Sequence, residues 1–313
     1  MKDNHFISVV TPVYKAEKIL RELVKKVEEQ LQKITDKYEL ILVEDCSPDN
    51  SWQVIEDIAR NNSKVKAIKF CRNFGQHPAI KAGIETAQGE CCIVMDCDLQ
   101  DDPAYIPQLF DKWKDGNDVV YTCKEKRKHS IFKNFTAILF YKVFNYLVGL
   151  ENSKADNNVG SYSLISRKVM NVFLRYNDYQ FHYLMVLRWI GFKSSYITIQ
   201  HKERYEGKSS YSFRKLIEHA AIGIVYQSNK LLHLNIMFGF IIACVALLCG
   251  SAIIYFYFAN GFKSGWASLF VLQLFMFGVI LISIGFVGVY IGKIFAQVKN
   301  RPQYLIDNKI NFY

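Results

Sequence analysis

Two long stretches without a charged residue, about 231–259 and 264–292, constrain the fold of this chain more than any other feature. Each is longer than the roughly 20 residues that a helix needs to cross the hydrocarbon core of a bilayer. We expect two membrane helices, at about 231–259 and 266–292, joined by a short connector into a hairpin. Lys230 precedes the hairpin, and further positive charges follow it at Lys293, Lys299, Arg301 and Lys309. The positive-inside rule then predicts a multi-pass protein of the inner (cytoplasmic) membrane, with both termini cytoplasmic and a basic tail at 293–313.

The net charge indicates which classes of partner the chain can bind. Its 313 residues carry a formal charge of +10, which favours nucleic acid, anionic membrane or phosphorylated ligands. No zinc-finger spacing, basic zipper or aromatic-and-basic RNA motif accompanies this charge, so we expect no nucleic-acid partner. The eight cysteines include no Cys-x-x-Cys pair, which is typical of reduced, buried cysteines. The first residues lead straight into an apolar run without a signal-peptide pattern, so we expect the N-terminal domain in the cytoplasm.

Strand and helix patterns alternate along the first two thirds of the chain. Apolar, β-rich runs predict strands at about 6–10, 38–43, 65–70, 91–95, 118–122, 159–165 and 194–200. Apolar residues at helical spacing predict helices between the first five strands, at about 18–34, 52–61, 78–87 and 104–114. This alternation is typical of βαβ units and a mainly parallel sheet. We therefore expect an α/β catalytic domain over 1–211, followed by an amphipathic juxtamembrane helix at 212–230.

Polar side chains follow three successive predicted strands, at the point where each strand ends. They are Glu44 and Asp45, then Arg72 and Asn73, then Asp96 and Asp98. Because the carboxyl ends of parallel strands meet at one edge of a sheet, these side chains predict a single cleft. Asp96, Asp98 and Gln100 supply the hard oxygen ligands that Mg²⁺ or Mn²⁺ prefers. The alternative is a helix start, with Asp101 or Asp102 as N-cap and Pro103 at the first position, and both interpretations can hold at once.

Phosphate-binding glycine motifs are absent from the sequence. There is no Gly-x-Gly-x-x-Gly after the first predicted strand and no Walker loop, which argues against dinucleotide and P-loop enzymes. A phosphate would then be handled by metal and basic side chains, and loop 201–211, which is basic and hydroxyl-rich, suits an anion. The apolar, aromatic stretch 131–150 predicts a helix lying at the membrane interface, with a buried core helix as the alternative.

These motifs together resemble the family 2 glycosyltransferases, specifically the branch that acts on polyisoprenyl phosphates and includes bactoprenol glucosyltransferases and dolichol-phosphate mannose synthases. Residues 8–14 (Ser-Val-Val-Thr-Pro-Val-Tyr) resemble the first strand of the family, and residues 44–51 resemble its Asp-Asp-Gly-Ser-x-Asp-Gly-Thr turn. The runs 72–76 (Arg-Asn-Phe-Gly-Gln) and 96–103 (Asp-Cys-Asp-Leu-Gln-Asp-Asp-Pro) are similar to signatures of this branch. Residues 204–211 are similar to its Arg-x-x-Gly-x-Ser-Lys-Tyr motif.

The resemblance implies a GT-A (nucleotide-diphospho-sugar transferase) fold, a nucleotide-sugar donor and a polyprenyl-phosphate acceptor. It implies that the donor contacts Pro12, Tyr14, Glu17, Glu44, Asp45, Arg72, Asp96, Gln100 and Lys208. It implies that Mg²⁺ or Mn²⁺ is held by Asp96, Asp98 and Gln100. The catalytic residues would be Asp98, Arg204, Asn158 and Ser161.

The chain departs from the family at 157–163 (Asn-Asn-Val-Gly-Ser-Tyr-Ser), where relatives usually read Asp-x-Gly-Asp-Phe-Arg. Asn158, Ser161 and Ser163 thus replace two acids and an arginine. A phosphate monoester has a second pKa of about 6, so it can attack at neutral pH without a strong general base. We therefore expect an inverting single displacement in which Asn158 and Ser161 tune the choice of sugar. Glu44, which replaces the first Asp of its motif, leaves the nucleotide base open, and UDP is the expected nucleotide.

The basic run 124–129 has two interpretations. Lys124 and Lys126 suit an anchor on anionic lipid, worth about 1 kcal/mol per charge, and Arg127 is a candidate for gathering the acceptor phosphate. Two other functions stay open: a family 2 transferase with a saccharide acceptor, and a degenerate membrane scaffold that binds nucleotide sugars. The first usually carries a Gln-x-x-Arg-Trp motif, which this sequence lacks. By analogy with relatives we also expect a homo-oligomer.

Overall fold

The computed structural model describes residues 2–124, 159–200, 230–260 and 265–312. These residues divide into two compact units. The first contains the described residues of 1–128, 154–209 and 301–313, and the second contains those of 129–153 and 210–300. The expected helix at 131–150, and residues 212–229 of the one expected at 212–230, lie outside the described residues.

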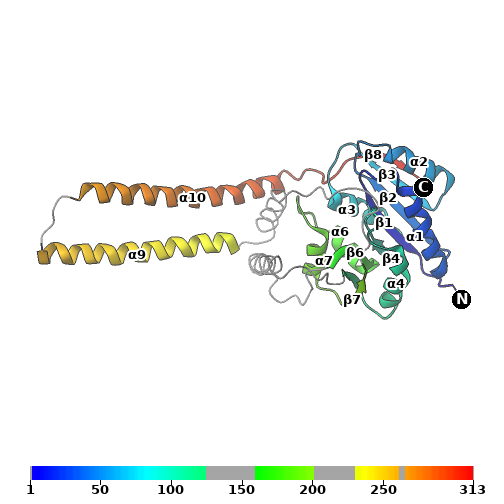
Figure 1. The fold of residues 1–313 in the computed structure, drawn as a ribbon, viewed down its shortest axis with the longest axis horizontal. Coiled ribbons are helices and arrows are strands. Elements are labelled where there is room, and N and C mark those ends of the chain that lie inside the picture. Colours follow the sequence, from blue (N-terminus) through cyan, green and yellow to red (C-terminus); the bar gives the residue numbers. More distant parts are fainter. Residues whose placement is uncertain (1, 125–158, 201–229, 261–264, 313) are drawn as a thin grey trace. The chain divides into compact units, whose positions relative to one another are not determined.

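In the first unit, the described residues form an eight-stranded sheet in the order β7-β5-β6-β4-β1-β2-β3-β8 (Figure 1). The strands are β1 (Ile7–Val13), β2 (Tyr38–Glu44), β3 (Val65–Phe70), β4 (Cys91–Val94), β5 (Val119–Lys124), β6 (Val159–Ser166), β7 (Ser194–Ile199) and β8 (Ile306–Ile310). β1 pairs in parallel with β2 and β4, β2 with β3, and β5 with β7. β6 is antiparallel to β4 and β5, and β8 is antiparallel to β3. The predicted mainly parallel α/β sheet is confirmed.

Helices cover both faces of this sheet. They are α1 (Leu20–Ile34), α2 (Ser51–Asn61), α3 (Gln76–Thr86), the 3₁₀ helix η1 (Pro103–Tyr105), α4 (Ile106–Lys114), α6 (Arg167–Leu174) and α7 (Tyr183–Ile190). α1, α2, η1 and α4 pack on one face, and α3, α6 and α7 pack on the other. A Cβ atom on Gly83 would lie 2.3 Å from Cγ1 of Val10, so α3 approaches β1 at a distance that only glycine permits.

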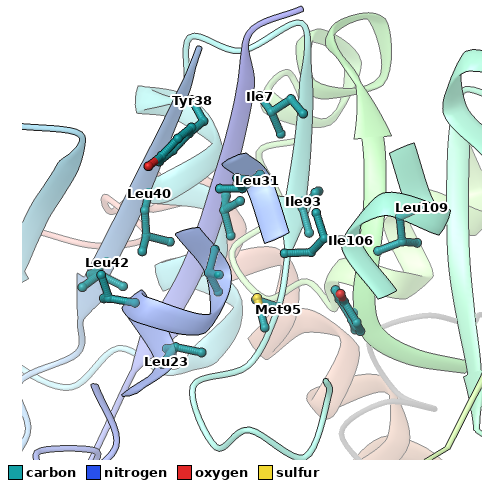
Figure 2. Close-up of a cluster of buried hydrophobic side chains, with 14 of the residues drawn as sticks. Ile7, Leu23, Leu31, Tyr38, Leu40, Leu42, Ile93, Met95, Ile106 and Leu109 are labelled. Carbon is teal, nitrogen blue, oxygen red and sulfur yellow. The ribbon is translucent and has the colours of Figure 1, made fainter. Parts of the chain in front are cut away.

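The hydrophobic core explains why the central strands read as continuous apolar runs. Figure 2 shows side chains of β1, β2 and β4 meeting those of α1 and α4 in one buried cluster. Leu40 and Leu42 of β2 lie in this cluster, whereas Ile41 and Val43 lie in the second cluster with residues of α3. All four side chains are fully buried, as are the residues of Cys91–Val94. A strand covered on both faces needs apolar residues at every position, which is the pattern seen in the sequence.

The second unit contains the helices α9 (Lys230–Asn260) and α10 (Trp266–Val298). They contact each other, and the Ser283 hydroxyl donates a hydrogen bond of 3.2 Å to Oδ1 of Asn235. Within the described residues, the segment Phe275–Val298 is long and apolar enough to cross a bilayer, and Leu232–Ile242 is a shorter apolar segment. α10 continues past the expected end at residue 292.

The interpretation of 293–313 as a basic tail missed a strand. After α10, residues Ile306–Ile310 form β8 and extend the edge of the sheet beside β3. The central side chains of β8 are exposed, and an edge strand with one solvated face carries few apolar residues. Its sequence (Ile-Asp-Asn-Lys-Ile) therefore lacks the apolar pattern that identified the other strands.

Candidate functional site

Three loops around the carboxyl ends of β1, β2 and β4 contain strained backbone. Among the described residues, five non-glycine residues have positive φ, and three of these lie in the three loops. They are Lys15 (φ 54°), Cys46 (φ 51°) and Leu99 (φ 54°). The left-handed conformation costs a residue with a Cβ about 1–2 kcal/mol, and such residues persist where the surrounding structure imposes them. Strain of this kind is common at functional sites, which makes this edge of the sheet the candidate site.

The loops after β1 and β2 hold each other in place. The Glu17 carboxylate accepts a 2.8 Å hydrogen bond from the Asn50 N–H, and the Asp49 carboxylate accepts one of 3.3 Å from the Glu17 N–H. The Ala16 N–H also donates to the Ser51 hydroxyl at 3.0 Å. Glu17, predicted to contact the donor, therefore also orders the loop that carries Tyr14.

Glu44 and Asp45 are both buried at the end of β2. Glu44 is 1% exposed and accepts a hydrogen bond from the Ser47 N–H, while its Oε2 has no hydrogen-bond partner in the described part of the chain. Asp45 accepts hydrogen bonds from the N–H groups of Phe74 and Gly75, at 2.7 and 2.8 Å. Burial raises the pKa of the Asp45 carboxyl group, and the two N–H donors offset this only in part. Asp45 thus positions the loop after β3, and its contact with a nucleoside stays a prediction.

Asp96 is where three distant segments meet. Its Oδ1 accepts a 2.7 Å hydrogen bond from Nε2 of Gln76, the first residue of α3. Its Oδ2 accepts a 3.0 Å hydrogen bond from the hydroxyl of Ser161 in β6. These two donors orient the Asp96 carboxylate, whose oxygens are of the hard type that Mg²⁺ or Mn²⁺ prefers. The structure thus brings Ser161, predicted from the sequence, next to Asp96, and it adds Gln76, which the sequence prediction missed.

The position of Gln76 in the chain indicates only which end of the strands it faces. It follows Gly75, whose φ of 100° lets the chain turn into α3, and it stands at the helix start nearest the strand ends. The amide therefore faces the same edge of the sheet as the carboxylates after β4. The missing information was the distance between Gln76 and Asp96, which only the folded chain supplies.

Asp98 and Asp102 have separate roles in the loop after β4. Asp98 accepts a 3.1 Å hydrogen bond from the Gln100 N–H, across the left-handed Leu99. Asp102 accepts a 3.0 Å hydrogen bond from the Ala104 N–H and caps η1, with Pro103 at its first position. The helix-start interpretation of this acidic run is therefore confirmed for Asp102 and Pro103, and metal binding by Asp96 and Asp98 stays a prediction.

The donor set at this loop fits a divalent cation. Asp96 and Asp98 are only partly buried, and together with Gln100 they offer hard oxygen ligands. In the part of the chain that the structure describes, no group of three or more His, Cys, Asp or Glu residues could hold a metal ion. Mg²⁺ commonly uses one or two protein carboxylates and takes its other ligands from substrate phosphates and water. Burial raises the pKa of the Cys97 thiol, which lies between the two carboxylates, to about 12.

The other predicted site residues are exposed at the surface, buried in the sheet, or outside the described residues. Tyr14 is 45% exposed, and the exposed Arg72 lies 4.2 Å from the ring centroid of Phe74. Pro12 is buried within β1, and Lys124 is the last residue of β5. The predictions for Lys126, Arg127, Asn158, Arg204 and Lys208 lie outside the described residues.

Ser163 supports the backbone next to Asp96. Its buried hydroxyl donates a 2.9 Å hydrogen bond to the carbonyl oxygen of Ser161 and lies 2.9 Å from the Tyr183 hydroxyl. Both Ser163 and Tyr183 are fully buried. Ser163, one of the departures from the family motif, is thus part of a satisfied polar contact inside the protein.

The family model described as Glycosyl transferase family 2 matches residues 8–173, from β1 into α6. Curated relatives align over nearly the whole chain. An uncharacterized glycosyltransferase of Bacillus subtilis (strain 168), YkcC, is 34% identical over 302 residues, which are 96% of this chain and 93% of the relative. The bactoprenol glucosyl transferase of Shigella phage SfII is 34% identical over 303 residues, which are 96% of this chain and 97% of the relative.

A solved structure shares the fold over most of this chain. Glucosyl-3-phosphoglycerate synthase from Mycobacterium tuberculosis, in complex with Mn²⁺, uridine diphosphate and phosphoglyceric acid, matches with a TM-score of 0.50 at 13% identity. The match covers 71% of this chain and 77% of that chain. It confirms the predicted GT-A-like α/β architecture. With the family model and the full-length relatives, it leads to one conclusion: this chain belongs to glycosyltransferase family 2 and is a glycosyltransferase.

Proposed function

We propose that this protein transfers a sugar from a nucleotide sugar, with UDP as the nucleotide, to a polyprenyl phosphate at the cytoplasmic face of the membrane. The observation that carries the proposal is the Asp96 carboxylate, held between Gln76 and Ser161 beside Asp98 at the carboxyl end of β4. Relatives named bactoprenol glucosyl transferase support a lipid-phosphate acceptor. A protein of similar fold holds UDP together with Mn²⁺, which supports the donor class.

The chemistry follows from the groups that react. An oxygen of the lipid phosphate forms a bond to the anomeric carbon of the sugar, and the bond to the nucleoside diphosphate breaks. The bonding electron pair leaves with the diphosphate, so negative charge develops there and must be neutralised. Bound Mg²⁺ or Mn²⁺ would supply this neutralisation.

Different residues of the chain would bind the cation, the donor and the sugar. Asp96 and Asp98 would hold the cation, and Gln76 and Ser161 orient Asp96 through their hydrogen bonds. The exposed rim residues Tyr14 and Arg72 would contact the donor. Arg204 and Lys208 would approach the departing diphosphate, and Asn158 would contact the sugar. Because the acceptor is already ionised, no side chain needs to remove a proton.

The membrane segments would bring the site to its lipid substrate. In the proposed topology α9 and α10 form a two-helix hairpin in the inner membrane, with both termini and the first unit in the cytoplasm. The positive charges beside the apolar segments support this orientation. Assembly into a homo-oligomer belongs to the same proposal.

A transfer assay tests the proposed function. Purified full-length protein is incubated with Mg²⁺ or Mn²⁺, undecaprenyl phosphate and a panel of UDP- and GDP-sugars, and lipid-linked sugar is measured. We expect product with one or a few UDP-sugars and none after chelation of the metal. Nucleotide-sugar binding without lipid product would indicate another acceptor, and neither binding nor product would contradict the proposal.

Replacing Gln76 with alanine should weaken metal activation. Loss of a hydrogen bond that orients a metal ligand typically lowers metal affinity by about 10-fold or more, so the Mn²⁺ concentration for half-maximal transfer should rise by this factor. The measurement is a metal titration of the transfer rate. Gln53→Ala on α2, which removes an exposed amide from another helix, is the matched control and should leave the titration unchanged. Equal curves for Gln76→Ala and wild type would contradict the role assigned to Gln76.

A further inference from the structure

The last residues of the chain return to the sheet beside the candidate site. We name residues Gln303–Phe312 the C-terminal segment; it contains β8, which pairs with β3 along the edge of the sheet. In this register Ile310 pairs with Ala67 and Ile306 pairs with Phe70. Phe70 ends β3 and is followed directly by loop 71–75, which leads into α3 and Gln76. The C-terminal segment therefore contacts the strand that carries this loop.

The C-terminal segment is anchored at two places. At the end distant from the loop, the Asn311 side-chain amide donates hydrogen bonds to the carbonyl oxygens of Ala59 and Val65, at 2.6 and 2.8 Å. At the end beside the loop, the Tyr304 ring stacks on the Phe70 ring, with centroids 5.2 Å apart and an interplanar angle of 12°. These two anchors hold the same segment but touch different parts of the first unit.

The anchor at Tyr304 holds both sides of the loop. The Tyr304 hydroxyl donates a hydrogen bond to the Glu85 carboxylate on α3. The Leu305 carbonyl oxygen accepts a 3.1 Å hydrogen bond from the N–H of Cys71, the first residue after β3. The strand before the loop and the helix after it are thus both tied to the C-terminal segment.

A continuous series of contacts leads from Tyr304 to the carboxylates of the site. The Phe70 ring, stacked on Tyr304, meets the Phe74 ring edge-on with centroids 5.6 Å apart. The N–H groups of Phe74 and Gly75 bind the Asp45 carboxylate, and the next residue, Gln76, binds Asp96. Each step is a contact between named groups, except that Gly75 and Gln76 are joined by the peptide bond between them.

We propose that Tyr304 is a positioning residue of the active site: by stacking on Phe70 and binding Glu85, it fixes loop 71–75 so that Gln76 orients Asp96. Tyr304 itself touches neither carboxylate, so its effect passes through the loop. Loss of its ring frees one side of Phe70 and loosens the contact of Phe70 with Phe74. The amides of Phe74 and Gly75 then open more often, and Asp96 is held less firmly.

Two variants separate positioning from general stability in the full-length protein. Tyr304→Ala removes the anchor beside the loop, and Asn311→Ala removes the anchor at the distant end of the same segment. Amide hydrogen exchange of loop 71–75 is measured for both and for wild type. We expect exchange at Phe74 and Gly75 to accelerate about tenfold in Tyr304→Ala, which is the factor expected from losing one aromatic pair, and to stay near the wild-type rate in Asn311→Ala. Tyr304→Phe retains the stacked ring and should keep most of the protection.

Metal activation provides a second readout of the same variants. The Mn²⁺ concentration for half-maximal transfer should rise in Tyr304→Ala, by less than the roughly 10-fold expected for Gln76→Ala, and stay unchanged in Asn311→Ala. This activity arm rests on the proposed function, whereas the exchange arm does not. If wild type shows no transfer with any donor, the proposed function fails and the exchange arm still decides the role of Tyr304.

Two results would overturn the positioning role. One is equal acceleration of Phe74 and Gly75 exchange in Tyr304→Ala and Asn311→Ala, which indicates that the segment acts only on overall stability. The other is unchanged exchange in Tyr304→Ala. If Tyr304→Ala does not fold, Tyr304→Leu takes its place and is judged by the same two outcomes.

Discussion

Replacing Asp98 with asparagine is expected to reduce sugar transfer about 10³-fold, the scale on which removal of one charge-stabilising group slows such reactions. Asparagine retains an oxygen that can accept the Gln100 N–H, so the turn at Leu99 should persist. What is lost is one negative charge of the proposed metal site. The measurement is the initial rate of lipid-linked sugar formation at saturating donor, with Mn²⁺ varied.

Asp102→Asn is the matched control for this variant. It makes the same chemical change four residues along the loop, and asparagine can still cap η1 by accepting the Ala104 N–H. We expect transfer close to wild type. A rate near wild type for Asp98→Asn, or equal losses for both variants, would contradict a metal-binding role for Asp98.

The second large effect is expected from a buried ion pair near the amino ends of β2 and β3. Nζ of Lys66 lies 2.6 Å from Oε2 of Glu39, whose side chain is 2% exposed. Oε1 of Glu39 accepts hydrogen bonds of 2.6 Å from both the Ser8 hydroxyl and the Gln88 N–H. Lys66→Met leaves this carboxylate buried without its cation, which should lower the free energy of unfolding by about 3–5 kcal/mol. In a domain of this size, the midpoint of thermal unfolding should fall by about 10 °C, measured by tryptophan fluorescence.

Two further variants test the cause of this destabilisation. Lys69→Met is the control on the same strand: Lys69 and its partner Asp307 are 32% and 53% exposed and 3.6 Å apart, so the cost should stay within about 1 kcal/mol. The double variant Glu39→Gln/Lys66→Met removes the stranded charge and keeps an acceptor for Ser8 and Gln88, so it should recover part of the loss. Equal melting midpoints for Lys66→Met and Lys69→Met would show that the ion pair contributes no more than a surface contact.

The elements that could be predicted are those in which one local pattern determines burial. Leu20, Leu23, Val24, Val27 and Leu31 recur at helical spacing, and all five are buried in α1. Cys91–Val94 is apolar at every position because helices cover both faces of β4. The helix start after β4 was equally predictable, because Asp102 caps η1 and Pro103 occupies its first position. Local spacing contains the whole explanation in these cases.

The features that could not be predicted depend on partners far along the chain. Gln76 and Ser161 meet at Asp96 from α3 and β6, and no local pattern indicates these contacts. Asp45 matched a nucleotide-binding motif, yet its carboxylate holds the N–H groups of the loop after β3. The sequence alone suggests that Lys66 is an ordinary surface charge on a strand. Only the burial of its partner Glu39 shows that Lys66 neutralises a carboxylate inside the protein.

The position of β8 has a consequence for how the protein is made. The ribosome completes β3 early, but its edge partner β8 emerges only after the apolar helices α9 and α10. Pairings between segments so distant in sequence form late, and an unpaired strand edge can aggregate or be degraded. A chain truncated within α10 would therefore leave the edge of β3 exposed. Completion of the eight-stranded sheet is tied in this way to synthesis of the entire apolar segment.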